Sequence, residues 1–229
     1  MPKIYLSPAA HGRDNPCGYD SACGENIHCN LYIDELEPYL LACGFAVKRN
    51  PKDRTGDRLK EAIAESNAWG ADLHYVAHTN AGGGAYSLLM VYDQGTAYGY
   101  AEKLAARRRE IYAGNVKISV QPQWDELRLT AAPAVYDEMV FHDNAKDIAW
   151  FHEHLREMAQ ATAKAICDMF GAAFVDPYAK PAEPAPEPEP DGDVWYRVQV
   201  GAFREKANAD RLCAELKEKG YSAYVKAGE

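Results

Sequence analysis

The chain has 229 residues, of which 47% are hydrophobic, 26% charged and 11% aromatic. This composition excludes a wholly disordered or collagen-like chain, and the length allows one large domain with a smaller unit. The net charge of −9 argues against nucleic acid as the main partner, because surfaces that bind nucleic acids are usually basic. No apolar run approaches the ~18 residues that span a membrane, and the amino terminus lacks an export-signal pattern.

Residues 176–193 form a proline- and acid-rich stretch that divides the chain. They include six prolines and six acidic residues and carry a charge of −5. Such a composition favours an extended, self-repelling chain. We therefore predict a large domain at 1–175, a linker at 176–193 and a small unit at 194–229, which is the only net-basic part.

In the predicted large domain, short segments rich in β-branched and aromatic residues alternate with longer segments of helical periodicity. In chain order they are a strand at Lys3–Leu6, a helix at Glu25–Cys43, a strand at Phe45–Lys48, a helix at Asp57–Trp69, strands at Leu73–Ala77 and Ser87–Tyr92, a helix at Ala97–Tyr112, strands at Lys117–Val120 and Ala134–Asp137, and a helix at Lys146–Phe170. Pro38 is expected to bend or shorten the first helix. The order predicts an α/β fold with a central, mostly parallel six-stranded sheet flanked by helices.

After the linker, the pattern predicts a strand at Trp195–Val200, a helix at Asn208–Lys219 and a second strand at Tyr221–Val225. This small β-α-β unit buries little apolar surface, so it is marginal as an independent fold.

Residues that can bind a metal ion gather where the predicted strands end. His11 follows the first strand, His78 follows the third, Asp137 and Glu138 end the sixth, and Glu25 opens the first helix. Asp137 and Glu138 are expected on opposite faces of the sheet, so only one of them can reach a shared ion. Ligands of parallel sheets bind beyond the carboxyl ends of the strands. Two histidines and one carboxylate suit a catalytic zinc site, and a further carboxylate can act as the base. Each of these residues can also have a purely structural role. Glu25, for example, would be stabilised at the start of a helix by the helix dipole.

Three other features indicate structural roles. Gly82–Gly84 lacks the order of a phosphate-binding loop, which predicts a flexible turn. His152 and His154 stand two apart on a predicted helix and are expected at the surface. The six cysteines contain no Cys-x-x-Cys pair, and a chain made in the cytoplasm is expected to keep its thiols reduced.

Four short sequence motifs in residues 1–172 occur in the order found in a known protein family. They are Ala10-His11-Gly12, Gly24-Glu25-Asn26, Ala77-His78-Thr79-Asn80-Ala81, and Glu138 to Asn144 followed by Asp147. In this order they resemble the zinc-dependent N-acetylmuramoyl-L-alanine amidases of the amidase type 3 family. The resemblance implies zinc bound by His11, Glu25 and His78, Glu138 as the catalytic carboxylate, and Asn80 as a candidate substrate contact. Ala10 and Ser7 replace a glycine and an aspartate of that pattern, which leaves the shape of the first turn open.

The resemblance implies a peptidoglycan hydrolase that cleaves the amide bond between N-acetylmuramic acid and L-alanine. Such an enzyme, made in the cytoplasm without a signal peptide, would reach the wall through a holin pore as a phage or prophage endolysin, or through mother-cell lysis as an autolysin. Two alternatives are a catalytically inactive module that binds peptidoglycan and a zinc hydrolase that acts on small peptides.

The segment from Trp195 to Phe203, continued by Tyr221–Val225, resembles the first half of a SPOR domain. SPOR domains bind peptidoglycan glycan strands and are built from two similar halves. The resemblance leaves three possibilities: the half unit pairs with a second copy in a dimer, it binds weakly by itself, or it has no binding role.

Overall fold

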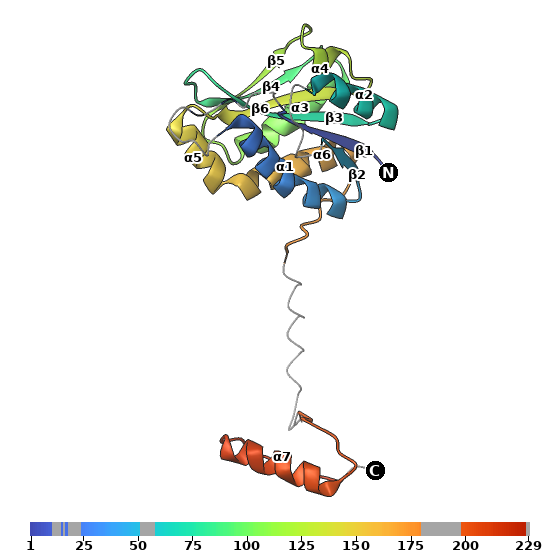
Figure 1. The fold of residues 1–229 in the computed structure, drawn as a ribbon, viewed down its shortest axis with the longest axis vertical. Helices are drawn as coiled ribbons and strands as arrows, with labels where there is room; N and C mark the ends of the chain where they lie inside the picture. Colours follow the sequence, from blue (N-terminus) through green and yellow to red (C-terminus); the bar gives the residue numbers. More distant parts are fainter. Residues whose placement is uncertain (11–14, 16, 18–23, 51–57, 180–197, 228–229) are drawn as a thin grey trace, which may run out of the picture. The chain divides into compact units, whose positions relative to one another are not determined.

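The computed structural model describes residues 1–10, 15, 17, 24–50, 58–179 and 198–227. The chain separates into two compact units, residues 1–179 and residues 180–229 (Figure 1). In the described parts of both units, no helix combines the length and the apolar character needed to cross a bilayer.

A six-stranded sheet forms the centre of the first unit, with strand order β2-β1-β3-β6-β4-β5. The strands are β1 (Lys3–Pro8), β2 (Ala46–Arg49), β3 (Leu73–Asn80), β4 (Tyr86–Val91), β5 (Asn115–Val120) and β6 (Ala134–Phe141). All neighbouring strands are parallel except β4 and β6, which are antiparallel. The predicted α/β fold with a mostly parallel sheet is confirmed.

Helices cover both faces of this sheet. They are α1 (Glu25–Ala42), α2 (Leu59–Trp69), α3 (Thr96–Arg109), α4 (Asp125–Arg128), α5 (Ala145–Glu153) and α6 (Leu155–Phe170). Figure 1 shows α1 and α6 on one side of the sheet and α2 and α4 on the other. The helix α1 continues through Pro38 to Ala42, the long final helix is interrupted at His154, and the short α4 was not predicted.

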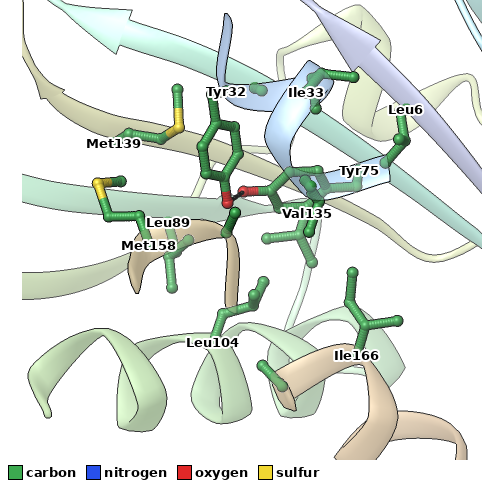
Figure 2. Close-up of a cluster of buried hydrophobic side chains, with 14 of the residues drawn as sticks. Leu6, Tyr32, Ile33, Tyr75, Leu89, Leu104, Val135, Met139, Met158 and Ile166 are labelled. Atoms are coloured by element: carbon green, nitrogen blue, oxygen red, sulfur yellow. Dashed lines mark hydrogen bonds between the residues drawn. The ribbon is translucent and has the colours of Figure 1, made fainter. Parts of the chain in front are cut away.

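The main hydrophobic core lies between the sheet and the layer formed by α1, α3 and α6. Figure 2 shows side chains from these helices interleaved with side chains of the strands, among them Tyr32 of α1 and Tyr75 of β3, whose hydroxyls lie 3.1 Å apart. A smaller cluster that includes Val76, Leu127 and Tyr136 packs on the opposite face, against α4. Residues of a strand alternate between the two faces, so β3 and β6 contribute to both clusters.

A buried ion pair joins α3 to β6. The Arg108 guanidinium lies 2.7 Å from the Asp137 carboxylate, and both side chains are at most 2% exposed. Arg108 also donates to the Ser87 hydroxyl at 2.9 Å, and the Tyr75 hydroxyl donates to Asp137 at 2.6 Å. These hydrogen bonds offset the cost of removing both charges from water.

We predict that Asp137→Ala lowers the free energy of unfolding by about 3–5 kcal/mol, because the substitution leaves Arg108 as an unpaired buried charge. The matched control is Asp168→Ala. Asp168 pairs with the neighbouring Arg107 at 2.8 Å, but both side chains are partly exposed, so the loss should stay below about 1 kcal/mol. Urea unfolding of the two variants measures the difference, and equal losses would contradict a stabilising role for the buried pair.

In the second unit, the predicted helix is confirmed as α7 (Lys206–Glu218), but the predicted strands are wrong where the structure describes them. Residues 198–200 and 221–225 form no strand, while Trp195 to Arg197 lie outside the described residues. A strand requires a hydrogen-bonded neighbour, and the described part of this unit supplies none. Val198, Val200, Tyr221 and Tyr224 are therefore largely exposed.

The expectation that all thiols are reduced is wrong at Cys17, which is disulfide-bonded. Cys29, Cys43, Cys167 and Cys213 form no disulfide. Disulfide formation depends on the approach of two Cβ atoms to about 4 Å, which composition and cellular compartment do not reveal.

Candidate active site

His78 and Glu138 lie side by side near the carboxyl ends of β3 and β6. The two residues are register partners in the parallel ladder, and the register shifts just after His78, between His78 and Asn80. Both side chains are nearly buried, with exposed fractions of 7% and 8%. Irregularities of this kind often re-aim side chains next to active sites. The fold therefore brings two of the four predicted zinc-site residues together on adjacent strands.

Glu25 reaches the same place from the first turn of α1. Its Oε1 atom lies 2.8 Å from Nδ1 of His78 and accepts a hydrogen bond from the Thr79 amide at 3.3 Å. Its Oε2 atom accepts a hydrogen bond from the Asn15 side chain at 2.6 Å. Both carboxylate oxygens are thus held by hydrogen bonds, and one of them touches the imidazole of His78.

His11, the third predicted ligand, lies outside the described residues. Among the residues that the structure does describe, no group of three possible metal ligands occurs. The donor chemistry of the two described ligands fits zinc, because imidazole nitrogen and carboxylate oxygen are the donors that catalytic zinc sites use. The fold brings these two donors within 2.8 Å of each other.

The surroundings of Glu138 differ from those of the other acidic residues near the site. Its Oε2 atom is buried and has no hydrogen-bond partner among the described residues. Burial, with added repulsion from Glu25 and Asp137, raises the pKa of Glu138 to about 8 from an ordinary value of 4.5. A buried carboxyl left without a partner beside candidate metal ligands is typical of a functional group.

Asp137, the neighbour of Glu138, points to the other sheet face, as the alternation of a strand predicts. Its contacts are with Arg108 and Tyr75, on the side of α3. Only Glu138 is therefore available to the site.

An aromatic wall next to His78 was missed from the sequence. The ring of Tyr136 lies 4.4 Å from the ring of His78, and the Trp124 ring contacts Tyr136 edge-on at 4.9 Å. Tyr136 and Glu138 stand two apart on β6, so strand alternation places them on one face. That spacing was the signal that could have identified Tyr136.

The helix α4, which follows Trp124, is fixed to the sheet by a buried carboxylate. Oε1 of Glu126 accepts a hydrogen bond from the Ser7 hydroxyl and lies 2.9 Å from Nε2 of His74. Ser7 is one of the departures from the family pattern, and here it anchors this helix. The contact has no local signal, because 119 positions separate Ser7 from Glu126.

Asn80 turns its side chain towards its own backbone, with Oδ1 accepting a hydrogen bond from the Ala81 amide at 2.8 Å. The following glycine turn is held by Asp143, whose carboxylate accepts hydrogen bonds from the amides of Gly82 at 2.6 Å and Gly83 at 3.0 Å. Both glycines adopt positive φ angles of 114° and 73°. The amides that a phosphate loop would offer are therefore occupied by hydrogen bonds to Asp143.

Asn144 and Asp147, which belong to the fourth motif of the resemblance, have structural roles. The Asn144 side chain caps α5 by accepting hydrogen bonds from the amides of Lys146 and Asp147. Asp147 in turn accepts hydrogen bonds from the Phe141 amide at 2.7 Å and the Tyr112 hydroxyl at 2.6 Å. These contacts fix the end of β6, three residues beyond Glu138.

Three further histidines, His28, His152 and His154, lie on or near α5. His152 is exposed, as predicted, while His154 is half-buried and stacks on Trp150 at 4.8 Å. His28 is buried, with its Nε2 atom 3.6 Å from the Cys17 sulfur and its ring 4.9 Å from that of His152.

Two curated amidases are similar in sequence to this chain. CwlM of Bacillus licheniformis, an N-acetylmuramoyl-L-alanine amidase, is 29% identical over 184 residues, which cover 75% of this chain and 64% of that protein. The sporulation-specific N-acetylmuramoyl-L-alanine amidase of Bacillus subtilis (strain 168) is 26% identical over 98% of this chain and 84% of its own length. The chain is a homologue of the N-acetylmuramoyl-L-alanine amidases. The predicted resemblance is confirmed.

The fold of about three quarters of the chain is similar to that of a solved amidase domain. The catalytic domain of CwlV, an amidase from Bacillus (Paenibacillus) polymyxa var. colistinus, matches with a TM-score of 0.67 and 15% identity, over 76% of this chain and all of that domain. The SPOR domain family matches residues 160–227. That match begins inside α6, so part of it falls in the first unit of this amidase homologue.

We predict that the metal-free chain loses stability as the pH rises from about 5 to about 8. In this interval the folded chain keeps a proton on Glu138 that the unfolded chain has lost, because burial and the charges of Glu25 and Asp137 raise the folded-state pKa to about 8. The free energy of unfolding should fall by at most about 1.4 kcal/mol per pH unit from this group. Urea unfolding in the presence of a chelator measures this slope.

The Glu138→Gln variant cannot titrate at this position, so its stability should decline less over the same interval. Glu153→Gln, at an exposed position on α5, serves as the matched control and should keep the full decline. Identical slopes for the wild-type and Glu138→Gln chains would show that Glu138 is already ionised at low pH in the folded state.

Proposed function

We propose that this chain is a zinc-dependent cell-wall amidase that hydrolyses the amide bond between N-acetylmuramic acid and L-alanine in peptidoglycan. The observation that carries the proposal is the 2.8 Å contact between Glu25 and His78, next to Glu138, whose buried Oε2 atom has no hydrogen-bond partner in the described part of the chain. Homology to amidases over most of the chain supports the same reaction.

In this proposal His11, Glu25 and His78 hold the zinc ion. A bound zinc ion lowers the pKa of a coordinated water towards 7 and polarises the carbonyl of the amide. The Thr79 amide and the Asn15 side chain keep the Glu25 carboxylate in place, and the Tyr136 ring limits the movement of the His78 imidazole. These contacts fix Glu25 and His78 before the ion binds.

Glu138 is the general base and acid of the proposed reaction. Its carboxylate accepts the proton of the attacking water, and the resulting carboxyl returns that proton to the departing L-alanine nitrogen. An ideal proton shuttle has a pKa near the operating pH, and burial raises the pKa of Glu138 into that range in the metal-free chain. The low exposure of His78 and Glu138 strengthens their electrostatic interactions with a reacting group.

The second unit is proposed to bind peptidoglycan glycan strands, since the SPOR family match covers its described residues. Only 198–227 of the matched residues are described in that unit, and they contain one helix and no paired strands. A second copy of the chain would supply the missing neighbours, with Val198, Val200, Tyr221 and Tyr224 as the apolar side chains available for pairing.

The site of action in this proposal is the bacterial wall, reached after release from the cell of synthesis. Holin-mediated release would make the chain an endolysin, and lysis of a mother cell would make it an autolysin. The relative that spans 98% of this chain is named as sporulation-specific, which supports the autolysin assignment.

We predict that Glu138→Ala retains zinc but loses hydrolysis of purified sacculi by about 10²–10⁴-fold, because it removes the proton shuttle and no metal ligand. His78→Ala should lose both zinc and activity. Elemental analysis measures the metal, and mass spectrometry of the released peptides measures cleavage at the L-alanine amide. Glu153→Gln, at an exposed position, should keep both.

Near wild-type turnover in Glu138→Ala would remove Glu138 from the mechanism. Hydrolysis that survives complete metal removal would refute the zinc enzyme. Full zinc occupancy with no cleavage of any muropeptide by the wild-type chain would favour an inactive, peptidoglycan-binding module.

We also predict that the full chain binds insoluble sacculi more tightly than residues 1–179, which retain the complete first unit. The Glu138→Ala background prevents digestion of the sacculi during the assay. Co-sedimentation measures the bound fraction, and equal retention of the two chains would mean that the second unit has no targeting role.

A further inference from the structure

Two free thiols meet where α1 and α6 end. Cys43 caps the carboxyl end of α1, and Cys167 lies in the last turn of α6. Cys167 is 2% exposed, Cys43 is partly exposed, and a side-chain hydrogen bond joins the two. Cys43 also packs against the hydrophobic cluster to which Cys167 belongs. The two thiols are therefore neighbours although 124 positions separate them in the sequence.

The segment that follows α6 holds both sulfur atoms. The Val175 amide donates to the sulfur of Cys43 at 3.2 Å, and the Cys43 thiol lies 3.6 Å from the Val175 carbonyl oxygen. The sulfur of Cys167 lies 3.8 Å from the carbonyl oxygen of Ala173. Residues 173–175 thus fix the two side chains against one another. The catalytic proposal uses neither thiol.

We propose that Cys43 and Cys167 are an oxidation site that closes to an intramolecular disulfide when the chain meets a small disulfide oxidant. The thiolate of Cys43 attacks one sulfur of the oxidant, forms a mixed disulfide and expels the first thiolate. The thiolate of Cys167 then attacks the sulfur of Cys43 and expels the second. The two cysteines lose two electrons and two protons in total, and the oxidant is reduced to two thiols.

The surroundings of the two sulfurs set the order of these steps. Cys43 is the more exposed thiol and is reached first by a soluble oxidant. Burial and the hydrogen bond with Cys43 raise the pKa of Cys167 to about 12, so this residue remains a thiol near neutral pH. Cys167 is therefore suited to the second, intramolecular step, in which its proximity to Cys43 compensates for its small thiolate fraction.

The disulfide would join the ends of two helices that pack on each other in the main core. Closing so long a loop restricts the unfolded chain far more than the folded one, which raises the melting temperature. The expected gain applies wherever the chain encounters an oxidising environment.

The test treats the full wild-type chain with oxidised glutathione and maps disulfides by mass spectrometry of non-reduced tryptic peptides. We expect a peptide pair that contains Cys43 and Cys167, absent from Cys43→Ser and Cys167→Ser but present in Cys213→Ser, whose substitution lies on α7 of the other unit. Oxidation should raise the melting temperature of the wild-type chain by about 5–10 °C.

The Cys43→Ser chain controls for the Cys17 disulfide, because any effect of the redox treatment at Cys17 should be the same in both chains. Its melting temperature should therefore shift by less than that of the wild-type chain. A Cys43 that becomes glutathionylated without forming the Cys43–Cys167 peptide would overturn the proposal. So would an unmodified Cys43 under conditions that fully modify Cys213.

Discussion

The pairing of β3 with β6 is the constraint on which the candidate site depends. It sets His78 opposite Glu138 and, one position earlier, Ala77 opposite Asp137. Because a slip of one residue would exchange the two faces of a strand, this register must be held firmly. The buried ion pair between Asp137 and Arg108 lies on the face covered by α1, α3 and α6. It opposes such a slip, because the slip would move Asp137 out of reach of Arg108. An ion pair on one face of the sheet therefore keeps Glu138 aimed at the other.

Support on the second face comes from side chains that are distant in the sequence. Glu126 ties α4 to β1 and β3 through Ser7 and His74, and Trp124, just before α4, packs on Tyr136. Tyr136 in turn contacts His78. The imidazole is thus supported by an aromatic ring on one side and hydrogen-bonded to Glu25 on the other. Rigid surroundings of this kind favour a reactive geometry that needs little rearrangement when a substrate binds.

Periodicity in the sequence was sufficient for the sheet and the main helices, because their apolar residues recur with the spacing of strands and helices. It also placed His78 and Glu138 at strand ends and Asp137 on the opposite face. It failed where long-range contacts decide the structure. The four-residue α4 is held by the hydrogen bond of Glu126 to Ser7, which lies 119 positions away. The break between α5 and α6 falls at His154, where no glycine or proline predicts the end of a helix. The two expected strands of the second unit have alternating residues but no described neighbour to pair with.

The metal-free site combines two features that both favour a cation. The pKa of Glu138 is raised because the carboxyl is buried and is repelled by the charge of Glu25. A positive ion bound between the two acids would offset that repulsion. The hydrogen bond between Glu25 and His78 requires a proton between the oxygen and Nδ1. If both atoms ligate one ion, Nδ1 must give up that proton, which the other ring nitrogen can carry. The hydrogen bond thus holds the two candidate ligands together in the metal-free chain, and shared coordination would take its place.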